Sequence, residues 1–514
     1  MSKINATCAA TLGFLLLSAC AVGPDYQKPN TKIDEQWNTY NNGVKTTPTQ
    51  DAAWWKTFHD PILNNLIEIG YKNNLTLQSA GAKVLQSKAQ LAQSVGELYP
   101  QQQGASGNYT RERLGGGGSI YGANTPSDFN IASSSVSSSW ELDFWGKYRR
   151  AIRANDATFF ASIAAYDDAL VSLTAEIGSA YIAIRMYQTQ IYITEKNITL
   201  QKENFKMTQV RYDAGKADLS DVEQANTTLA QTEASLPPLK IDLQQQKDAL
   251  AVLLGTTPNK VDALLGKNKS RIPVAPSSVA VGIPKDVLRQ RPDVHQAELE
   301  AIAQSEGIGA IKAQLYPAFS LSGSFGYSAS NIGQSSPSDI FQWSNHTYSV
   351  GPSVSIPLFN YGQITNQVRA QDAAFQAAIF NYQNVVLTAQ KEVQDGIVSY
   401  VESQKALKSM IAANEAAIKT TQLSITRYEA GEIDYSSVID AEKNQLSVQM
   451  SLINAQNSVP QGLISLYRAL GGGWQIRKGH DVVSDDVKKE MKERTNWGSV
   501  LDDNKAPSTV LPSW

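Results

Sequence analysis

Two very long stretches without helix breakers constrain this chain more than any other feature of its sequence. Residues 147–211 contain no proline and one glycine, Gly178, and their apolar side chains recur at helical spacing. Roughly 65 residues at about 1.5 Å each would form a helix about 100 Å long. Residues 363–428 predict a second helix of similar size. Such lengths are typical of coiled coils and exceed those of ordinary core helices.

The two stretches belong to an internal duplication. The residues RYDAG at 211–215 return 216 positions later as RYEAG at 427–431. A Leu-Gly pair returns at the same offset, and a Leu-Tyr-Pro motif returns at an offset of 217. We therefore expect a tandem repeat. The expected segments are a signal peptide (1–19), an N-terminal segment and linker (20–60), a first repeat (61–255), an equatorial linker (256–283), a second repeat (284–471) and a C-terminal tail (472–514).

Each long helix should turn back on itself at a glycine. Gly215 and Gly431 directly follow the two long helices, as glycine does at helix C-termini. Return helices are then expected over 219–254 and 436–470, so that each repeat ends in a helical hairpin.

Other segments give weaker signals of regular structure. Pro237, Pro238 and Pro460 lie inside the expected return helices and predict kinks or breaks there. The linker is rich in Pro, Ser and Lys and shows little periodicity. The tail is charged and irregular, so we expect it to pack loosely.

Between the helices the period of polarity changes from 3.6 to 2. Three segments alternate in this way, at about 131–145, 318–328 and 346–359, and the segment at about 103–112 is a weaker fourth strand. One set of positions is apolar, and the other is dominated by serine. A half-buried sheet would also alternate. A small, uncharged polar face over such a length is instead typical of strands between lipid and a water-filled lumen.

Four strands are too few to close a barrel in a membrane. The smallest closed membrane barrels have about eight strands. An open sheet edge cannot sit in lipid, because its backbone groups would find no hydrogen-bond partners. Membrane-spanning strands would therefore require several copies of the chain. Two copies supply about eight strands and three supply about twelve, and the composition does not choose between them.

The N-terminus carries an export signal. Lys3 precedes an apolar run that is too short to span a membrane and ends in Leu17-Ser18-Ala19-Cys20. This ending resembles a bacterial lipobox, which implies cleavage before Cys20 and a diacylglycerol on its thiol, while Cys8 leaves with the signal peptide. Several acyl chains on one cysteine anchor a protein stably. An ordinary signal peptide followed by a chance cysteine is the alternative.

A series of short motifs runs along the rest of the chain. They are CAVGPDY at 20–26, IP at 283–284, RPDV at 291–294, AE at 297–298, RY with Gly431 at 427–428, VIDA at 438–441 and ALGGGW at 469–474. Together and in this order they resemble the OprM/TolC family of outer-membrane efflux channels, in its lipoprotein branch. The resemblance implies a mixed α/β membrane protein with four strands per protomer. In that family a trimeric twelve-stranded transmembrane β-barrel continues into a long α-helical coiled-coil tunnel through the periplasm.

The function implied by this resemblance is passive export. The homotrimer would dock a periplasmic adaptor that joins an inner-membrane pump of the RND type, so that drugs or other small compounds leave the cell. It would sit in the bacterial outer membrane, with Ala21 after the lipidated cysteine favouring that location. No cofactor is implied beyond the covalent lipid on Cys20. Two alternatives stay open: a channel for type I protein secretion, and a lipid-anchored periplasmic scaffold without a pore.

The same resemblance assigns roles near the hairpin tips. The turns that begin at Arg211 and Arg427 and end at Gly215 and Gly431 would contact the adaptor. Asp440 would form a ring of three carboxylates on the axis, which attracts cations.

The second role that the resemblance implies is to hold the helices closed at the hairpin tips. Arg427 and Tyr428 match family residues that hold neighbouring helices together, with Asp221 as their acidic partner through a charge-assisted bond. Alternatively, Asp440 is a solvated surface residue, and Arg427 and Tyr428 only end their helix. Ser436 and Ser437 depart from the family, whose members often have Leu or Asp there.

Other classes of protein are disfavoured. The formal net charge of −3 argues against a nucleic-acid binder. The four histidines are scattered without metal-binding spacing, and no nucleophile or phosphate-loop motif is present, so neither a metal site nor an enzyme is expected. Trp54 and Trp55 should be packing anchors. The cluster of Trp140, Phe144 and Trp145 should lie at a membrane interface.

Overall fold

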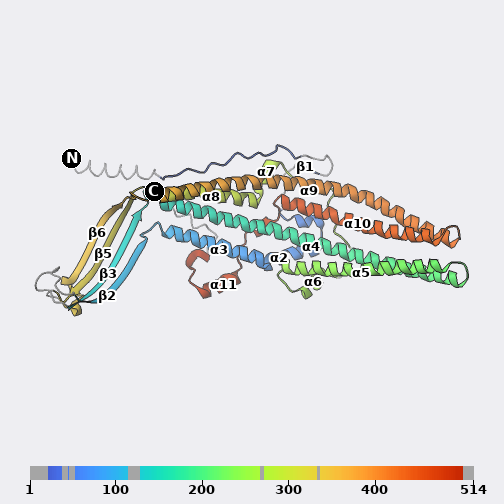
Figure 1. Ribbon diagram of the computed structural model, residues 1–514, viewed down its shortest axis with the longest axis horizontal. Coiled ribbons are helices and arrows are strands. Elements are labelled where there is room, and N and C mark those ends of the chain that lie inside the picture. Colours follow the sequence, from blue (N-terminus) through green and yellow to red (C-terminus); the bar gives the residue numbers. More distant parts are fainter. Residues whose placement is uncertain are drawn as a thin grey trace.

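The computed structural model describes residues 21–37, 44–45, 52–113, 128–266, 271–332 and 336–501. It is an elongated molecule with a sheet at one end and helical hairpins that reach the other end (Figure 1). The signal peptide and Cys20 lie outside the described residues.

The two long helices predicted from the sequence are present. Helices α4 (Lys147–Asp213) and α9 (Gln363–Glu429) each have 67 residues. The return helices α5 (Leu219–Leu253) and α10 (Tyr435–Ala469) each have 35 residues. Corresponding helices begin 216 positions apart, which is the offset of the sequence motifs. The shorter helices are α2 (Pro61–Asn73), α3 (Leu75–Gly96), α7 (Pro284–Gln290) and α8 (Pro292–Lys312).

Both hairpins turn through the same hydrogen-bonding pattern. Gly215 has φ +69° and Gly431 has φ +77°, a conformation that only glycine adopts without strain. The N–H after each glycine donates to the carbonyl five residues earlier, Lys216 to Arg211 at 2.8 Å and Glu432 to Arg427 at 2.9 Å. This is a Schellman motif, which explains why Arg-Tyr precedes Ala-Gly at a fixed distance in both copies.

Of the kinks or breaks predicted at the prolines of the return helices, the breaks do not occur. Helix α5 continues through Pro237 and Pro238, and α10 continues through Pro460. Pro237 and Pro238 are exposed, so water can reach the carbonyls that lose their helical donor. Pro460 is buried where α10 packs against neighbouring helices, and that packing supports the helix there.

Four strands form one antiparallel sheet in the order β2-β3-β5-β6. They are β2 (Gln102–Arg113), β3 (Asp128–Leu142), β5 (Ala318–Ser330) and β6 (His346–Ser355). Strands are thus found at all four expected segments. Strand β6 ends four residues earlier than expected, since the nearby Pro357 lacks the N–H that a sheet ladder requires. The central β3–β5 pair joins the two repeats.

The linker and tail are more ordered than the sequence suggests. The linker contains helix α6 (Pro258–Leu265) and strand β4 (Val279–Ala280), which pairs in parallel with β1 (Val44–Lys45). In the tail, helix α11 covers Asp485–Arg494, and Val483 and Leu501 are buried against Leu85. Arg477 forms two hydrogen bonds of 2.6 and 2.8 Å to Asp167 on α4. The expectation of loose packing is therefore wrong, because these buried side chains and the Arg477–Asp167 pair hold the mostly charged tail against the helices.

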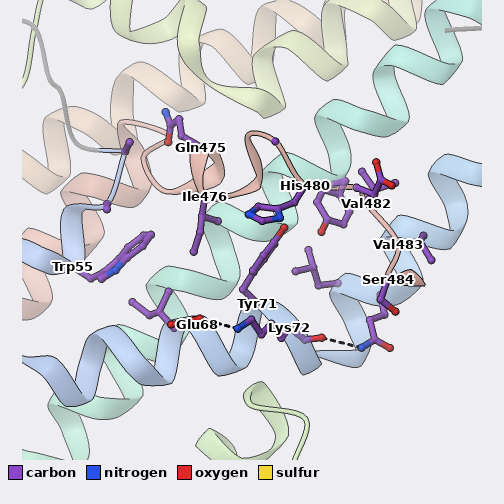
Figure 2. Close-up of a pocket in the computed structure, with 18 of the residues that line it drawn as sticks. Trp55, Glu68, Tyr71, Lys72, Gln475, Ile476, His480, Val482, Val483 and Ser484 are labelled. Atoms are coloured by element: carbon purple, nitrogen blue, oxygen red, sulfur yellow. Dashed lines mark hydrogen bonds and ion pairs between the residues drawn. The ribbon is translucent and has the colours of Figure 1, made fainter. Parts of the chain in front are cut away.

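The tail also forms one wall of a cavity of about 1010 Å³ beside α2. Figure 2 shows Tyr71 of α2 pointing toward His480 of the tail, while Lys72 lies along α2 and pairs with Glu68. The Tyr71 and His480 rings lie 6.3 Å apart. The tail is therefore part of the folded region around the middle of the helices, which we call the equatorial region.

The main apolar core lies beside this equatorial region and draws on both repeats. Trp54 is fully buried, stacks on Tyr467 of α10 at 5.7 Å and meets Trp55 edge-on at 5.8 Å. This confirms the packing role expected for both tryptophans. Helix α4 contains a window long and apolar enough to cross a membrane, but 67% of that window is buried inside the protein. We therefore assign it to the core.

Candidate functional site: a two-faced sheet and paired hairpin tips

The strand register gives the sheet two chemically different faces. One face carries rows such as Val136, Phe325 and Tyr348, which are direct cross-strand neighbours. The adjacent row, on the opposite face, contains Ser137, Ser324 and Ser349. Alternation within a strand was visible in the sequence, but only the pairing shows that like residues align across β3, β5 and β6, where β2 adds the small residues Ala105 and Gly104 to the two rows.

The serine face is small, polar and nearly uncharged. Ser106 and Ser135 are joined across β2 and β3 by a 3.1 Å hydrogen bond between their hydroxyl oxygens. Within the described strands, the ionisable side chains on this face are Glu112 and Glu141, both near strand ends. A face of this kind suits contact with water and dissolved solutes of either charge.

The sheet ends in two free edges. Strand β2 pairs only with β3, and β6 pairs only with β5, among the described residues. The apolar face is exposed, with Tyr348 and Val350 about three-quarters accessible at 74% and 75%. A sheet with this face in lipid needs partners at both edges, because unpaired backbone groups are not tolerated there.

Three aromatic residues mark the boundary between sheet and helices. Trp140 donates through Nε1 to the Leu98 carbonyl at 3.0 Å, and Trp145 donates to the Pro317 carbonyl at 2.8 Å. The Phe144 and Phe319 rings lie 4.9 Å apart. Their place where β3 gives way to α4 matches the region expected for interfacial aromatics.

The N-terminal arm, residues 21–37, begins at this same boundary. The Val22 N–H donates to the Trp145 carbonyl at 3.0 Å. Asp25 pairs with the buried Arg150 at 2.9 Å, and Arg150 also pairs with Glu306 at 2.9 Å. Figure 1 shows the arm running along the helices away from the sheet. Cys20 lies outside the described residues, and its chain neighbour Ala21 contacts Gly146 at the sheet–helix boundary.

The two hairpin tips contact each other within one chain. The Arg211 guanidinium lies 4.7 Å above the Tyr428 ring, and its Nη1 donates to the Glu429 carbonyl at 3.2 Å. The Tyr428 ring lies 5.0 Å from that of Tyr435 and is only 5% exposed. Burial raises the Tyr428 pKa, and the nearby negative charge of Asp221 raises it further, while Arg211 opposes the shift.

The predicted gate residues are thus only partly gathered in one chain. Asp221 lies close enough to Tyr428 for its charge to act on the tyrosine hydroxyl. Arg427 instead pairs with Glu432 of its own turn at 3.1 Å, and both side chains are 58% exposed. Asp440 is exposed on α10. The sequence analysis did not identify Arg211 as the cation over Tyr428, although the repeated Arg-Tyr motif contained it.

A ladder of polar pairs, buried on the α4 side, joins α4 to α10 above the tips. The α4 residues recur every seven positions, and each reaches a polar side chain of α10. The pairs are Gln190 with Asn454 at 2.9 Å, Asn197 with Gln449 at 2.9 Å, and Asn204 with Glu442. Burial raises the Glu442 pKa, while the hydrogen bond from Asn204 partly offsets the shift. Polar residues at heptad spacing are the sequence signal for this seam.

Comparison with known proteins agrees with this architecture. A family model described as outer membrane efflux protein matches residues 66–256 and 283–472. Nodulation protein T of Rhizobium leguminosarum bv. viciae is 31% identical over 479 residues, covering 91% of this chain and 94% of that protein. The cation efflux system protein CusC of Escherichia coli is 26% identical, covering 90% and 97%. The outer-membrane channel OprN superposes with a TM-score of 0.80 at 31% identity, covering 89% of this chain and all of that one.

A two-faced antiparallel sheet continuous with long helical hairpins defines a subunit of a membrane channel. The chain belongs to the outer membrane efflux protein family. It is an outer-membrane efflux protein whose helices extend into the periplasm, and the expected function and location are confirmed.

Proposed function

We propose that three copies of this chain close one transmembrane barrel of about twelve strands, four from each copy. The single observation that carries this proposal is the two-faced sheet with two free edges. Pairing β6 of one copy with β2 of the next would satisfy both edges, turn the apolar face to lipid and enclose the serine face. The hairpins of the three copies would then line a continuous tunnel.

Such a trimer is a passive channel through which compounds leave the cell. The hairpin tips, centred on Arg211–Gly215 and Arg427–Gly431, meet a periplasmic adaptor, and an inner-membrane pump of the RND type supplies the energy. Relatives named for cation, toluene and antibiotic efflux support export of small compounds. The nearly uncharged lumen of the barrel imposes little selection by charge. A lipid on Cys20 anchors the arm where the strands enter the membrane.

The narrowest part of the tunnel lies near the tips in this proposal. Asp440 is exposed on α10 in the single chain, so three copies could bring their carboxylates around the axis. Asp221, Tyr428 and Arg427 hold the tips together when the channel is at rest, and adaptor binding releases them.

Single-channel recording of the purified protein in a planar bilayer tests the proposal. The protein should migrate as a heat-sensitive trimer and conduct weakly, and Arg427→Ala or Asp440→Ala should raise the conductance. A membrane-inserted trimer without conductance in any variant would favour the scaffold. Recovery of an adaptor from a protein-secretion system, instead of a drug-efflux adaptor, would favour type I secretion.

A further inference from the structure

Because the chain is a tandem repeat, the contact between its two hairpins predicts how a hairpin of one chain meets a hairpin of the next chain. Helix α4 corresponds to α9, and α5 corresponds to α10, at a constant offset of 216 positions. Within one chain, α4 of the first hairpin packs against α10 of the second. The equivalent contact for α9 is α5, and in a closed ring of hairpins that α5 belongs to the next copy. This reasoning rests on the proposed trimer.

Two buried and two partly buried residues at the tip have four exposed counterparts at the offset of 216 positions. Tyr428 and Tyr435 are buried in a cluster at the tip, against which Met207 packs, with Arg211 above the Tyr428 ring. Their counterparts are Tyr212 at 37% exposed, Leu219 at 53%, Leu423 at 64%, and Arg427 at 58%. These four residues are exposed in the single chain, although the equivalent residues of the other repeat pack against a hairpin. We therefore expect the exposed residues to pack against a hairpin of the neighbouring chain.

We propose that Arg427 stacks on Tyr212 of the partner subunit, with Leu423 packed against Leu219 of the partner subunit. By the same equivalence, the Arg427 guanidinium donates to the backbone carbonyl of Asp213 of the partner subunit. The tips of a trimer then carry a closed ring of six cation–π contacts, three within chains and three between them. In this arrangement Arg427 exchanges its exposed pairing with Glu432 for the ring of the partner.

The contact between hairpins of one chain and the proposed contact between hairpins of neighbouring chains differ above the tips. The polar residues Gln190, Asn197 and Asn204 of α4 correspond to Ala406, Ala413 and Thr420 of α9. Their α10 partners correspond to Pro238, Glu233 and Asn226 of α5. The seam between subunits therefore keeps at most one rung of the ladder, which Thr420 and Asn226 of the partner subunit would form. Between the hairpins of neighbouring subunits, the contact of Arg427 with Tyr212 of the partner subunit becomes the main polar link, and the hairpins separate first along this contact when the tunnel opens.

Thiol crosslinking tests the pairing. Tyr212→Cys with Arg427→Cys, treated with a short bismaleimide, should yield covalent dimers and trimers of the chain. The matched control is Arg211→Cys with Tyr428→Cys, which should crosslink within one chain and leave it monomeric on a denaturing gel. Both proteins are first checked for trimers by size. Intact trimers in which only the control pair reacts would overturn the proposal and leave the proposed function standing, whereas absence of trimers would overturn both.

Channel recordings give a second measurement that does not depend on crosslinking. Removing three cation–π contacts at once should raise the open probability by roughly tenfold. Arg427→Ala and Tyr212→Ala should therefore each open the channel, and the double variant should open it no further. Tyr212→Phe keeps the aromatic face and should behave as wild type. Additive effects of the two alanine variants would contradict a direct contact.

Discussion

Arg150 at the start of α4 and Glu306 in α8 form an ion pair inside the protein, with 2.9 Å between Arg150 Nη1 and Glu306 Oε2. The two residues are 156 positions apart and come from different repeats. Both are largely buried, whereas the second partner of Arg150, Asp25 of the arm, is 86% exposed. The junction between sheet and tunnel is thus tied by one arginine that serves three segments.

Arg150→Ala should destabilise the protein by about 3–5 kcal/mol, because it leaves the Glu306 carboxylate buried without its cation. The measurement is denaturant unfolding in detergent, combined with limited proteolysis of the arm. Asp25→Ala is the matched control and should cost under about 1 kcal/mol, since its side chain is exposed. Equal losses for the two variants would show that the arm, and not the buried pair, carries the stability.

Gly396→Ala should be strongly destabilising. A Cβ at Gly396 would lie 2.9 Å from the Leu466 backbone Cα, so α9 and α10 would have to separate. The cost should be about 1–3 kcal/mol, which is typical of overpacking. Gly96→Ala at the end of α3 meets open space and should raise stability by up to about 1 kcal/mol. Thermal unfolding of both variants checks the prediction, and a neutral Gly396→Ala would contradict the close helix contact.

Glu442 should make stability depend on pH. Burial raises its pKa above the ordinary value of 4.5, so the folded protein binds its proton more tightly than the unfolded chain does. This contribution is complete below the unfolded pKa and is lost as the pH rises through the folded pKa. Glu442→Gln should therefore flatten the stability profile in that window. Unfolding midpoints measured across mildly acidic to neutral pH test this, and a steeper profile in the variant would contradict it.

Asp440→Asn should reduce the preference of the open channel for cations, because the proposed ring loses its three negative charges. Reversal potentials in a salt gradient provide the measurement. Asp485→Asn, at a fully exposed position on α11 of the tail, removes an equal charge and should leave the reversal potential unchanged. A change of equal size in both variants would show that overall charge, and not a ring on the axis, sets the selectivity.

Local periodicity and turn chemistry determined much of this fold from the sequence alone. The long helices, the reversals at Gly215 and Gly431, and the four alternating strands follow from patterns that act over a few residues. These patterns persist because the helix and strand periods are fixed by backbone geometry. The duplication was equally visible, since its motifs recur at one offset.

Only the tertiary structure decided which residues meet across the chain. The sequence analysis chose Arg427 as the cation of the tip, but in one chain Arg211 lies over Tyr428 while Arg427 pairs with Glu432. The two arginines occupy local motifs that differ only by Asp213 in place of Glu429, and this difference does not indicate which arginine lies over Tyr428. Their surroundings differ because the second hairpin packs on one side of the first, and that choice of side is set by contacts between distant segments. The ordered tail has the same cause, since Arg477 reaches Asp167 over 310 positions of sequence.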